Sequence, residues 1–264
     1  MRPALRVLLV LLVAAALAPR PLAASGSAGP ELVVFAAASL REAFAQAASS
    51  FEKDRPGVHV RFNFAGSQEL RTQLEQGAVA DVFASADEHQ MEGARAAGLV
   101  EAERILATNA PVVIVPRANP AGVRAFAELP RARRLVIGAP EVPIGRYTLQ
   151  ILDRASQRLG AGFRAEVEAR VVSRELNVKQ VLAKVALGEA DAGIVYATDA
   201  RAAADRVTVV AIPAELNVVA VYPIAVLRRA PQPALAQEWL ALLGSPEGQT
   251  LLAGFGFGPP AAAP

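Results

Sequence analysis

The sequence contains no cysteine, and of its 264 residues two are histidine. A chain without cysteine forms no disulfide, no thiolate metal site, no cysteine nucleophile and no lipid anchor on an N-terminal cysteine. Two histidines are too few for a histidine-rich metal cluster. Aromatic residues are also scarce, at 5%, whereas hydrophobic residues make up 53%. This composition favours a chain that folds around a core over a disordered one.

Motifs of the common catalytic folds are missing as well. The chain has no G-x-S-x-G, the serine motif of α/β-hydrolases, no G-x-G-x-x-G after a strand and no G-x-x-x-x-G-K-[ST]. His59 falls on the polar face of an expected strand and His89 near an expected helix start, so neither is placed to activate a serine. Tyr147, Tyr196 and Tyr222 are scattered, without an adjacent pair to bind ferric iron. The sequence therefore predicts a binding protein, with no catalytic residue, no metal-binding loop and no cofactor.

The N-terminus has the layout of a secretory signal peptide. Arg2 and Arg6 precede an apolar run over residues 7–18, and small residues follow up to Ala24. The apolar run is shorter than the ~20 residues that a membrane-spanning helix needs. Residues 1–24 are therefore predicted to be cleaved, with an N-terminal membrane anchor as the alternative. Cleavage changes the formal charge from +2 to about −1, since 24 basic residues then face 25 acidic ones, and a nucleic-acid ligand loses its support.

The rest of the chain alternates short apolar runs with amphipathic runs. This rhythm predicts an α/β protein whose sheets are mostly parallel and flanked by helices. Strands are expected at 32–37, 58–64, 81–85, 112–115, 135–138, 168–172, 192–196, 207–212 and 218–227. Helices are expected at 40–53, after 66, after 87, at 146–159, after 177, near 198, at 235–243 and at 246–253.

Several of the expected strand-to-helix turns carry serine or glycine and open a helix directly. Such turns present free backbone N–H groups and the positive end of a helix dipole, which together suit an anion. In open α/β sheets these turns line the ligand crevice. Plain helix capping is the alternative role for each serine, and Ser39 to Glu42 has the pattern of a capping box. Residues 142–145 are expected to form a turn before the helix at 146–159.

Five ligand loops in order along the chain resemble those of the periplasmic molybdate-binding proteins. The matching segments are 35–40 (FAAASL), 66–68 (GSQ), 142–147 (VPIGRY), 177–182 (NVKQVL) and 193–196 (GIVY), with the run 77–87 (GAVADVFASAD) between the second and third. The resemblance spans residues 31–258. It implies a two-lobed type II binding-protein fold, with residues 31–110 and 222–258 in lobe one and residues 111–221 in lobe two.

The same resemblance implies which residues contact the ligand. Ser39 and Ser67 would each offer a hydroxyl and a backbone N–H, Ile144 and Val178 a backbone N–H, and Tyr196 its phenol. Ile144 departs from the smaller residue of many relatives and would reshape the pocket wall. Arg146 is also unusual, and a contact at the surface or between the lobes is expected for it rather than one with the anion.

The implied protein is a monomeric periplasmic receptor that captures molybdate or tungstate between its lobes and delivers it to an ABC permease in the inner membrane. A pocket of donors alone suits a fully deprotonated oxyanion, because the proton of monohydrogen phosphate needs an acceptor. Two alternatives stay open. One is a binding protein for another tetrahedral anion, such as sulfate or phosphate, and the other is a secreted serine hydrolase that uses Ser39 or Ser67.

Overall fold

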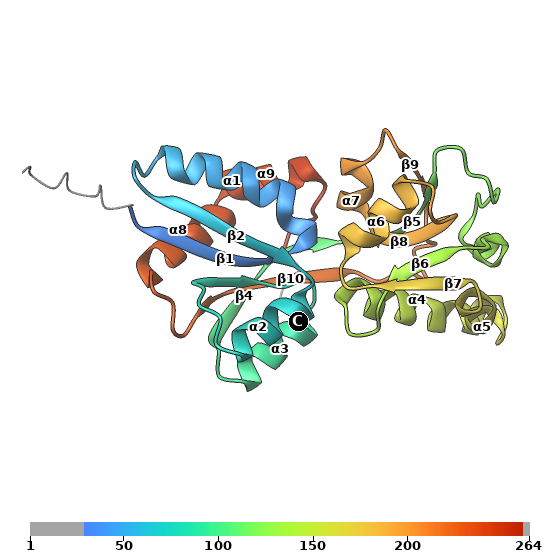
Figure 1. Cartoon of the computed structure of the whole chain (residues 1–264), viewed down its shortest axis with the longest axis horizontal. Coiled ribbons are helices and arrows are strands. Elements are labelled where there is room, and N and C mark those ends of the chain that lie inside the picture. Colours follow the sequence, from blue (N-terminus) through green and yellow to red (C-terminus); the bar gives the residue numbers. More distant parts are fainter. Residues whose placement is uncertain (1–28, 261–264) are drawn as a thin grey trace, which may run out of the picture.

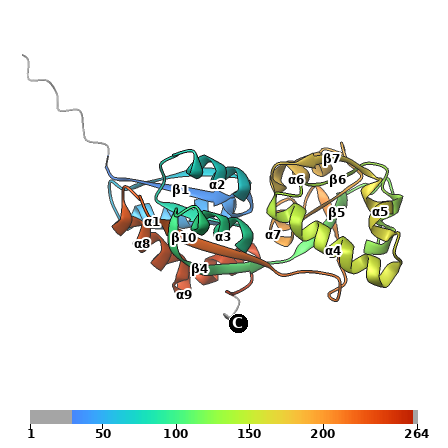
Figure 2. The same ribbon diagram turned by 90° about the horizontal axis from the view of Figure 1, so that it is seen from below.

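Two five-stranded sheets, each with helices on both faces, form the two lobes of the computed structural model (Figures 1 and 2). The structure describes residues 29–260, so the predicted signal peptide over residues 1–24 lies outside the described residues. Among residues 29–260, no helix has both the length and the apolar character needed to cross a membrane. The α/β class predicted from the sequence is confirmed.

The sheet of lobe one has the strand order β2-β1-β3-β10-β4. Its strands are β1 (Glu31–Ala37), β2 (His59–Ala65), β3 (Val82–Ala84), β4 (Val100–Asn109) and β10 (Ala220–Leu227). Its helices are α1 (Arg41–Lys53), α2 (Ser67–Glu75), α3 (Glu88–Ala96), α8 (Pro233–Gly244) and α9 (Pro246–Phe255), with the short 3-10 helix η1 (Ala38–Leu40) before α1. In the core of this lobe, the rings of Phe44 and Phe51 pack edge-on against Trp239, with ring centroids 5.5 and 5.4 Å from that of Trp239.

The sheet of lobe two has the strand order β7-β6-β8-β5-β9. Its strands are β5 (Pro111–Pro116), β6 (Leu135–Gly138), β7 (Val171–Glu175), β8 (Ala192–Tyr196) and β9 (Val207–Val210). Its helices are α4 (Pro143–Leu159), α5 (Phe163–Glu168), α6 (Val178–Ala186) and α7 (Ala197–Ala202), with the 3-10 helix η2 (Phe126–Arg131).

Both sheets are mixed, which corrects the expectation of mostly parallel sheets. In lobe one β1 pairs in parallel with β2 and β3, whereas β10 pairs antiparallel with β3 and β4. Lobe two repeats this pattern, with β5 antiparallel to β8 and β9. The sequence pattern predicts no strand at β4, because exposed or half-exposed charges at Glu101, Glu103 and Arg104 break its apolar run. An edge strand with solvent on one side tolerates such charges.

Two further predictions were wrong in their boundaries. Helix α4 begins at Pro143 and not at Arg146, so the expected turn over 142–145 is mostly the first turn of the helix; proline suits that first position because its missing N–H has no helical partner there. The expected strand over 168–172 starts instead at Val171. The preceding residues form α5, which buries Phe163 and Val167, four positions apart on one face of the helix.

The chain passes between the lobes twice. It leaves lobe one after β4 at Asn109, enters β5 at Pro111, and returns through residues 211–219 to β10. Asn109 and Ala220 are paired in the antiparallel ladder of β4 and β10, so the two crossing segments lie side by side (Figure 2). The lobe boundaries expected from the sequence, at 110/111 and near 222, stay a prediction.

Candidate functional site

The five residues that the sequence singles out surround one small pocket between the lobes. The space between the lining side chains is about 10 Å³, about the least that holds one ordered water. Lobe one contributes the end of β1, η1, the start of α2 and Ala86, and lobe two contributes the starts of α4 and α6 and the end of β8. The lining residues are Ala37, Ala38, Ser39, Ala65, Gly66, Ser67, Ala86, Val142, Pro143, Ile144, Asn177, Val178 and Tyr196.

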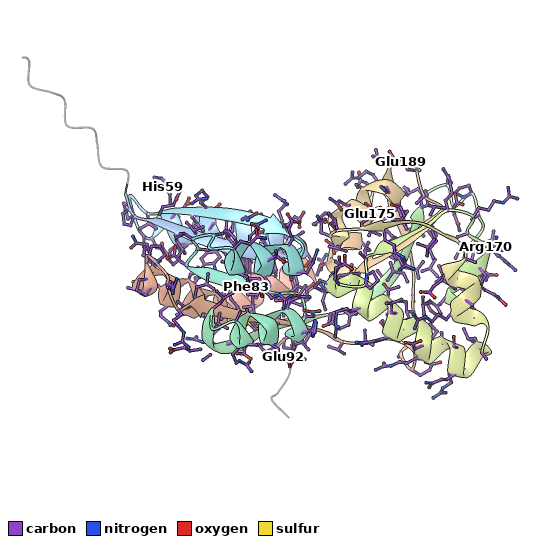
Figure 3. The ribbon with its side chains drawn as sticks, turned by 60° about the horizontal axis from the view of Figure 1, so that its bottom comes forward. His59, Phe83, Glu92, Arg170, Glu175 and Glu189 are labelled. Carbon is purple, nitrogen blue, oxygen red and sulfur yellow. The ribbon has the colours of Figure 1, made fainter. Side chains whose placement is uncertain are left out.

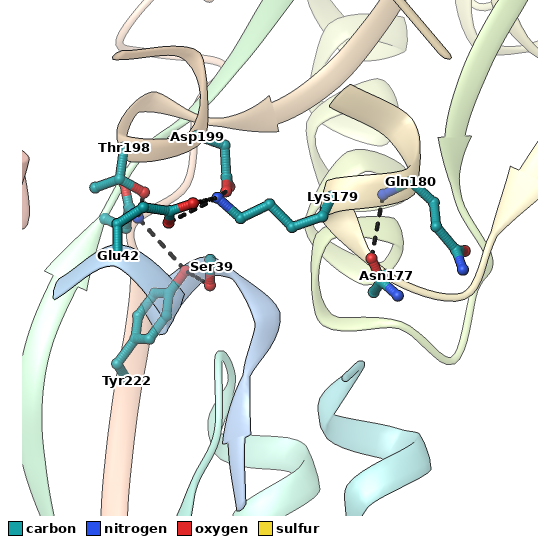
Figure 4. Close-up of polar contacts among 9 residues, drawn as sticks. Ser39, Glu42, Asn177, Lys179, Gln180, Thr198, Asp199 and Tyr222 are labelled. Carbon is teal, nitrogen blue, oxygen red and sulfur yellow. Dashed lines mark hydrogen bonds and ion pairs between the residues drawn. The ribbon is translucent and has the colours of Figure 1, made fainter. Parts of the chain in front are cut away.

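Ser39 and Ser67 lie on the lobe-one side, and both hydroxyl oxygens have a partner inside the protein. Ser39 Oγ is 2.9 Å from Tyr222 Oη (Figure 4). Ser67 Oγ accepts a hydrogen bond of 3.0 Å from the backbone N–H of Ala86. The capping box expected from Ser39 to Glu42 is wrong, since the cap of α1 has no side-chain hydrogen bond. The Ser39 hydroxyl instead contacts Tyr222 on β10.

Three helices begin at the pocket. The first N–H groups of a helix have no intrahelical partner and lie at the positive end of its dipole. Neither the Gly66 cap of α2 nor the Val142 cap of α4 makes a side-chain hydrogen bond to these groups. Asn177 caps α6, but its Oδ1 accepts from Gln180 N, two residues beyond Val178. The backbone N–H groups of Ser67, Ile144 and Val178 therefore lie in the first turns of their helices, where they have no hydrogen-bond partner within the helix.

Glycine lets the start of α4 come this close to the sheet of lobe two. A Cβ on Gly145 would lie 1.9 Å from the carbonyl oxygen of Ala139. A Cβ on Gly138 would lie 2.8 Å from the backbone nitrogen of Gly145. Any side chain at either position would push α4, and with it Ile144, away from the end of β6.

Tyr196 is 1% exposed, and its Oη has no hydrogen-bond partner among residues 29–260. Burial raises the pKa of the phenol well above its ordinary value, so it keeps its proton at neutral pH and remains a donor. The three tyrosines, which are scattered in sequence, form one cluster in space. The ring centroids of Tyr147 and Tyr196 are 6.4 Å apart, and those of Tyr196 and Tyr222 are 5.7 Å apart.

No charged side chain is among the residues that line the pocket, but two ion pairs join the lobes beside it. Lys179 Nζ on α6 lies 2.8 Å from Glu42 Oε2 on α1 and 2.9 Å from Asp199 Oδ1 on α7 (Figure 4). Burial opposes the charge of Lys179, yet the two carboxylates outweigh it and hold its pKa above the usual value. Each of these charges already has a protein partner of opposite sign.

The second ion pair involves Arg146. Its Nε lies 3.4 Å from Asp87 Oδ2, at the cap of α3 in lobe one. The expectation of a contact between the lobes is thus confirmed for this side chain. Burial raises the pKa of Asp87, although the Gln90 N–H and Arg146 both favour its charged form.

Three residues that support the site or its rim carry no prediction from the sequence. They are Tyr222, Asn109 and Lys179. Their partners lie far away in sequence. Ser39 and Tyr222, for example, are 183 positions apart. Lys179 stands within a motif that the sequence reading singled out, but its carboxylate partners are in other segments. No local spacing signals such pairs.

Among residues 29–260, neither Ser39 nor Ser67 has a hydrogen-bond partner that would activate its hydroxyl. His59 lies at the outer end of lobe one, far from the space between the lobes (Figure 3). The partners of the two serine hydroxyls are a phenol and a backbone N–H. Among residues 29–260, no group of three or more histidine, cysteine or acidic residues is placed to hold a metal ion.

Comparisons with known proteins identify relatives over nearly the whole chain. Residues 32–258 match the model of the bacterial extracellular solute-binding protein family. The molybdate-binding protein ModA of Mycobacterium tuberculosis is 45% identical over 244 residues, which cover 90% of each chain. The resemblance indicated by the five loops is confirmed.

Two solved structures share the fold. The periplasmic molybdate-binding protein of Azotobacter vinelandii has a TM-score of 0.75 and 22% identity, covering 87% of this chain and all of the other. The sulfate-binding protein SubI of Mycobacterium tuberculosis has a TM-score of 0.77 and 18% identity, covering 87% of each chain. At these identities the similarity shows the two-lobed fold, and the ligand has to be argued from the site.

Proposed function

Because the chain belongs to the bacterial extracellular solute-binding protein family, we propose that it captures molybdate between its two lobes and delivers it to an ABC importer. The relative at 45% identity carries that ligand in its name. It and the matching family are binding proteins for transport, not enzymes, and molybdate is accordingly cargo, not a cofactor.

The observation that carries the proposal is a pocket of neutral hydrogen-bond donors without a charged lining residue. Burying a dianion removes its hydration shell, which has to be replaced by oriented donors. In this assignment Ser39 and Ser67 donate their hydroxyls and N–H groups, Ile144 and Val178 donate backbone N–H groups, and Tyr196 donates its phenol. Hydrogen bonds to a charged group contribute about 1.5–3 kcal/mol each, so each donor matters.

The size of the pocket supports a compact inorganic ion. Sites for organic ligands are typically several hundred Å³, whereas this space is about 10 Å³. Sugars, amino acids and peptides do not fit without a wide opening of the lobes. A tetrahedral ion is larger than one water but needs only a small separation of the lobes, and it is small enough to be surrounded from both sides at once.

Further parts of the proposal concern ligand range and location. Tungstate resembles molybdate in size and charge, and we expect both to bind. The protein is expected to act as a monomer in the periplasm, after cleavage of residues 1–24, with an inner-membrane permease as its partner. Closure around the ligand follows from its contacts with both lobes, because a ligand favours the state in which it makes more contacts.

Titration calorimetry of residues 25–264 against molybdate, tungstate, sulfate and phosphate tests the proposal. We expect molybdate and tungstate to bind with micromolar affinity or better, which corresponds to at least about 8 kcal/mol, and sulfate to bind far more weakly. Equal affinities for sulfate and molybdate would contradict the proposed ligand. A folded protein that binds none of the four anions would contradict the whole assignment.

A further inference from the structure

A serine hydroxyl can donate or accept, so the identity of the residue does not decide which of the two it offers to a ligand. Its role depends on whether other groups of the protein donate to the hydroxyl oxygen or accept its proton. Ser67 shows this directly, since its Oγ accepts from the N–H of Ala86. With an acceptor site of Ser67 in use, its proton is free to point into the pocket.

For Ser39 the partner is Tyr222 Oη, at 2.9 Å, and either oxygen could be the donor from geometry alone. Asn109 resolves the direction. Its Oδ1 accepts from the backbone N–H of Ala110 at 2.9 Å, which fixes the orientation of the amide. The Asn109 Nδ2 group then faces Thr198 Oγ1 at 2.9 Å and Tyr222 Oη at a longer 3.4 Å.

An amide nitrogen donates and does not accept, so Tyr222 Oη is the acceptor of the Asn109 contact. Tyr222 is fully buried, and a buried hydroxyl proton without an acceptor costs about 1–3 kcal/mol. Among the hydrogen bonds of the described residues, Ser39 Oγ is the acceptor within reach of that proton. In the arrangement that satisfies these groups, Asn109 Nδ2 donates to Tyr222 Oη, and Tyr222 Oη donates to Ser39 Oγ.

We propose that Tyr222, oriented by Asn109, is a specificity-determining residue that fixes the Ser39 hydroxyl as a donor toward the pocket and so selects oxyanions that carry no proton. The inference rests on the proposed function, since it concerns the same pocket. It adds Tyr222 and Asn109, which are not among the residues that line the pocket. They contact no ligand themselves and act as positioning residues through Ser39.

The chemical consequence is a difference between two classes of anion. Molybdate and sulfate carry no proton at neutral pH and only accept, whereas monohydrogen phosphate brings one O–H that needs an acceptor. When Tyr222 donates to the Ser39 oxygen, the proton of Ser39 itself is left for the ligand, so Ser39 offers a donor and disfavours that O–H. If Tyr222 were lost, Ser39 could turn and accept from the phosphate proton.

The Tyr222→Phe variant tests the proposal, because it removes the donor to Ser39 and keeps the ring. Affinities for molybdate and for phosphate at neutral pH are measured by calorimetry on the folded protein. We expect about a tenfold loss for molybdate, with phosphate unchanged or tighter, so that the preference for molybdate falls at least tenfold. Tyr147→Phe is the matched control: its Oη accepts from Val221 N at 3.2 Å and does not contact Ser39. Any effect of losing this contact between α4 and β10 should be shared by both anions, so the preference for molybdate should stay as in the wild type.

A double-mutant cycle with Ser39→Ala separates positioning from general structural damage. If Tyr222 acts through Ser39, Tyr222→Phe has no further effect on molybdate affinity in the Ser39→Ala background. Thermal unfolding checks that each variant is folded. An equal loss for molybdate and phosphate, or an undiminished loss in the Ser39→Ala background, would overturn the proposal.

The wild-type titration distinguishes this failure from failure of the proposed function. Binding of sulfate without molybdate would overturn the proposed ligand, and the comparison of anions is then made between sulfate and phosphate. A wild-type protein that binds none of these anions overturns the proposed function and this inference together.

Discussion

The Tyr196 hydroxyl shows most directly how a single residue is prepared for a ligand. It is buried between the lobes and has no hydrogen-bond partner among the described residues. Such a group destabilises a folded protein by about 1–3 kcal/mol relative to a paired or apolar one. We therefore infer that the unpaired phenol donates a hydrogen bond to a bound anion.

Replacing Tyr196 by phenylalanine is therefore expected to move stability and affinity in opposite directions. The ligand-free Tyr196→Phe protein should be as stable as the wild type or slightly more stable, because an unpaired buried hydroxyl is removed. Its molybdate affinity should fall roughly 10- to 150-fold, the value of one hydrogen bond to a charged group. Urea unfolding without ligand and calorimetry with ligand measure the two quantities; a loss of stability without a loss of affinity would contradict the assigned role.

The residues that line the pocket could be predicted from the sequence, but the residues that hold them in place could not. Ser39, Ser67, Ile144, Val178 and Tyr196 stand in short motifs, and all five line one pocket in the structure. Whether they bind the anion stays a prediction. Tyr222 and Asn109 belong to no motif, and their importance depends on contacts between segments that are distant in sequence.

Secondary-structure elements position the donors through the way each helix begins. Most strands and helices could be predicted from apolar periodicity and capping signals, such as Asn177 before α6 and Gly188 after it, whose φ is +74°. The start of α4 could not, because it depends on a close approach between two segments. That approach requires glycine at 138 and 145, and a glycine in the sequence does not say what it approaches.

Gly145→Ala should therefore damage both the fold and the site. The new Cβ would meet the Ala139 carbonyl at 1.9 Å, and overpacking of this kind typically costs 1–3 kcal/mol. We expect a lower midpoint of thermal unfolding and at least tenfold weaker molybdate binding, because the Ile144 N–H moves with the helix. Gly162→Ala is the control, since its Cβ meets its nearest neighbour at an ordinary 3.6 Å. Equal behaviour of the two variants would contradict this account of α4.

The molecule as a whole is held in its present arrangement by contacts from one lobe to the other. Besides the two ion pairs, Gln68 Nε2 donates to the carbonyl of Leu176 at 2.8 Å, and Gln90 Nε2 donates to that of Glu141 at 3.0 Å. These contacts stabilise the arrangement in which the two lobes face each other across the pocket. A ligand binds more tightly when its competent state is already populated.

Glu42→Gln removes one of these contacts and leaves Lys179 its partner Asp199. We expect a larger radius of gyration for the ligand-free variant in solution scattering, and a molybdate affinity that is lower by a few-fold, as suits a partly exposed ion pair. Salt screens such pairs, so the difference from the wild type should shrink as ionic strength rises. Glu31→Gln, which removes an exposed ion pair with Arg61 inside lobe one, should change neither quantity; a Glu42→Gln protein that behaves like it would contradict the role of this contact.

The pairing of Asn109 with Ala220 has a consequence for the history and engineering of the chain. Residues 110–219 leave and rejoin neighbouring positions of one antiparallel ladder, so lobe two has the connectivity of an insertion into the β4–β10 hairpin of lobe one. A segment whose two ends meet in this way is a natural unit for exchange. Lobe two of a relative could be grafted between Asn109 and Ala220, which would allow one half of an anion pocket to be varied while the other half is kept.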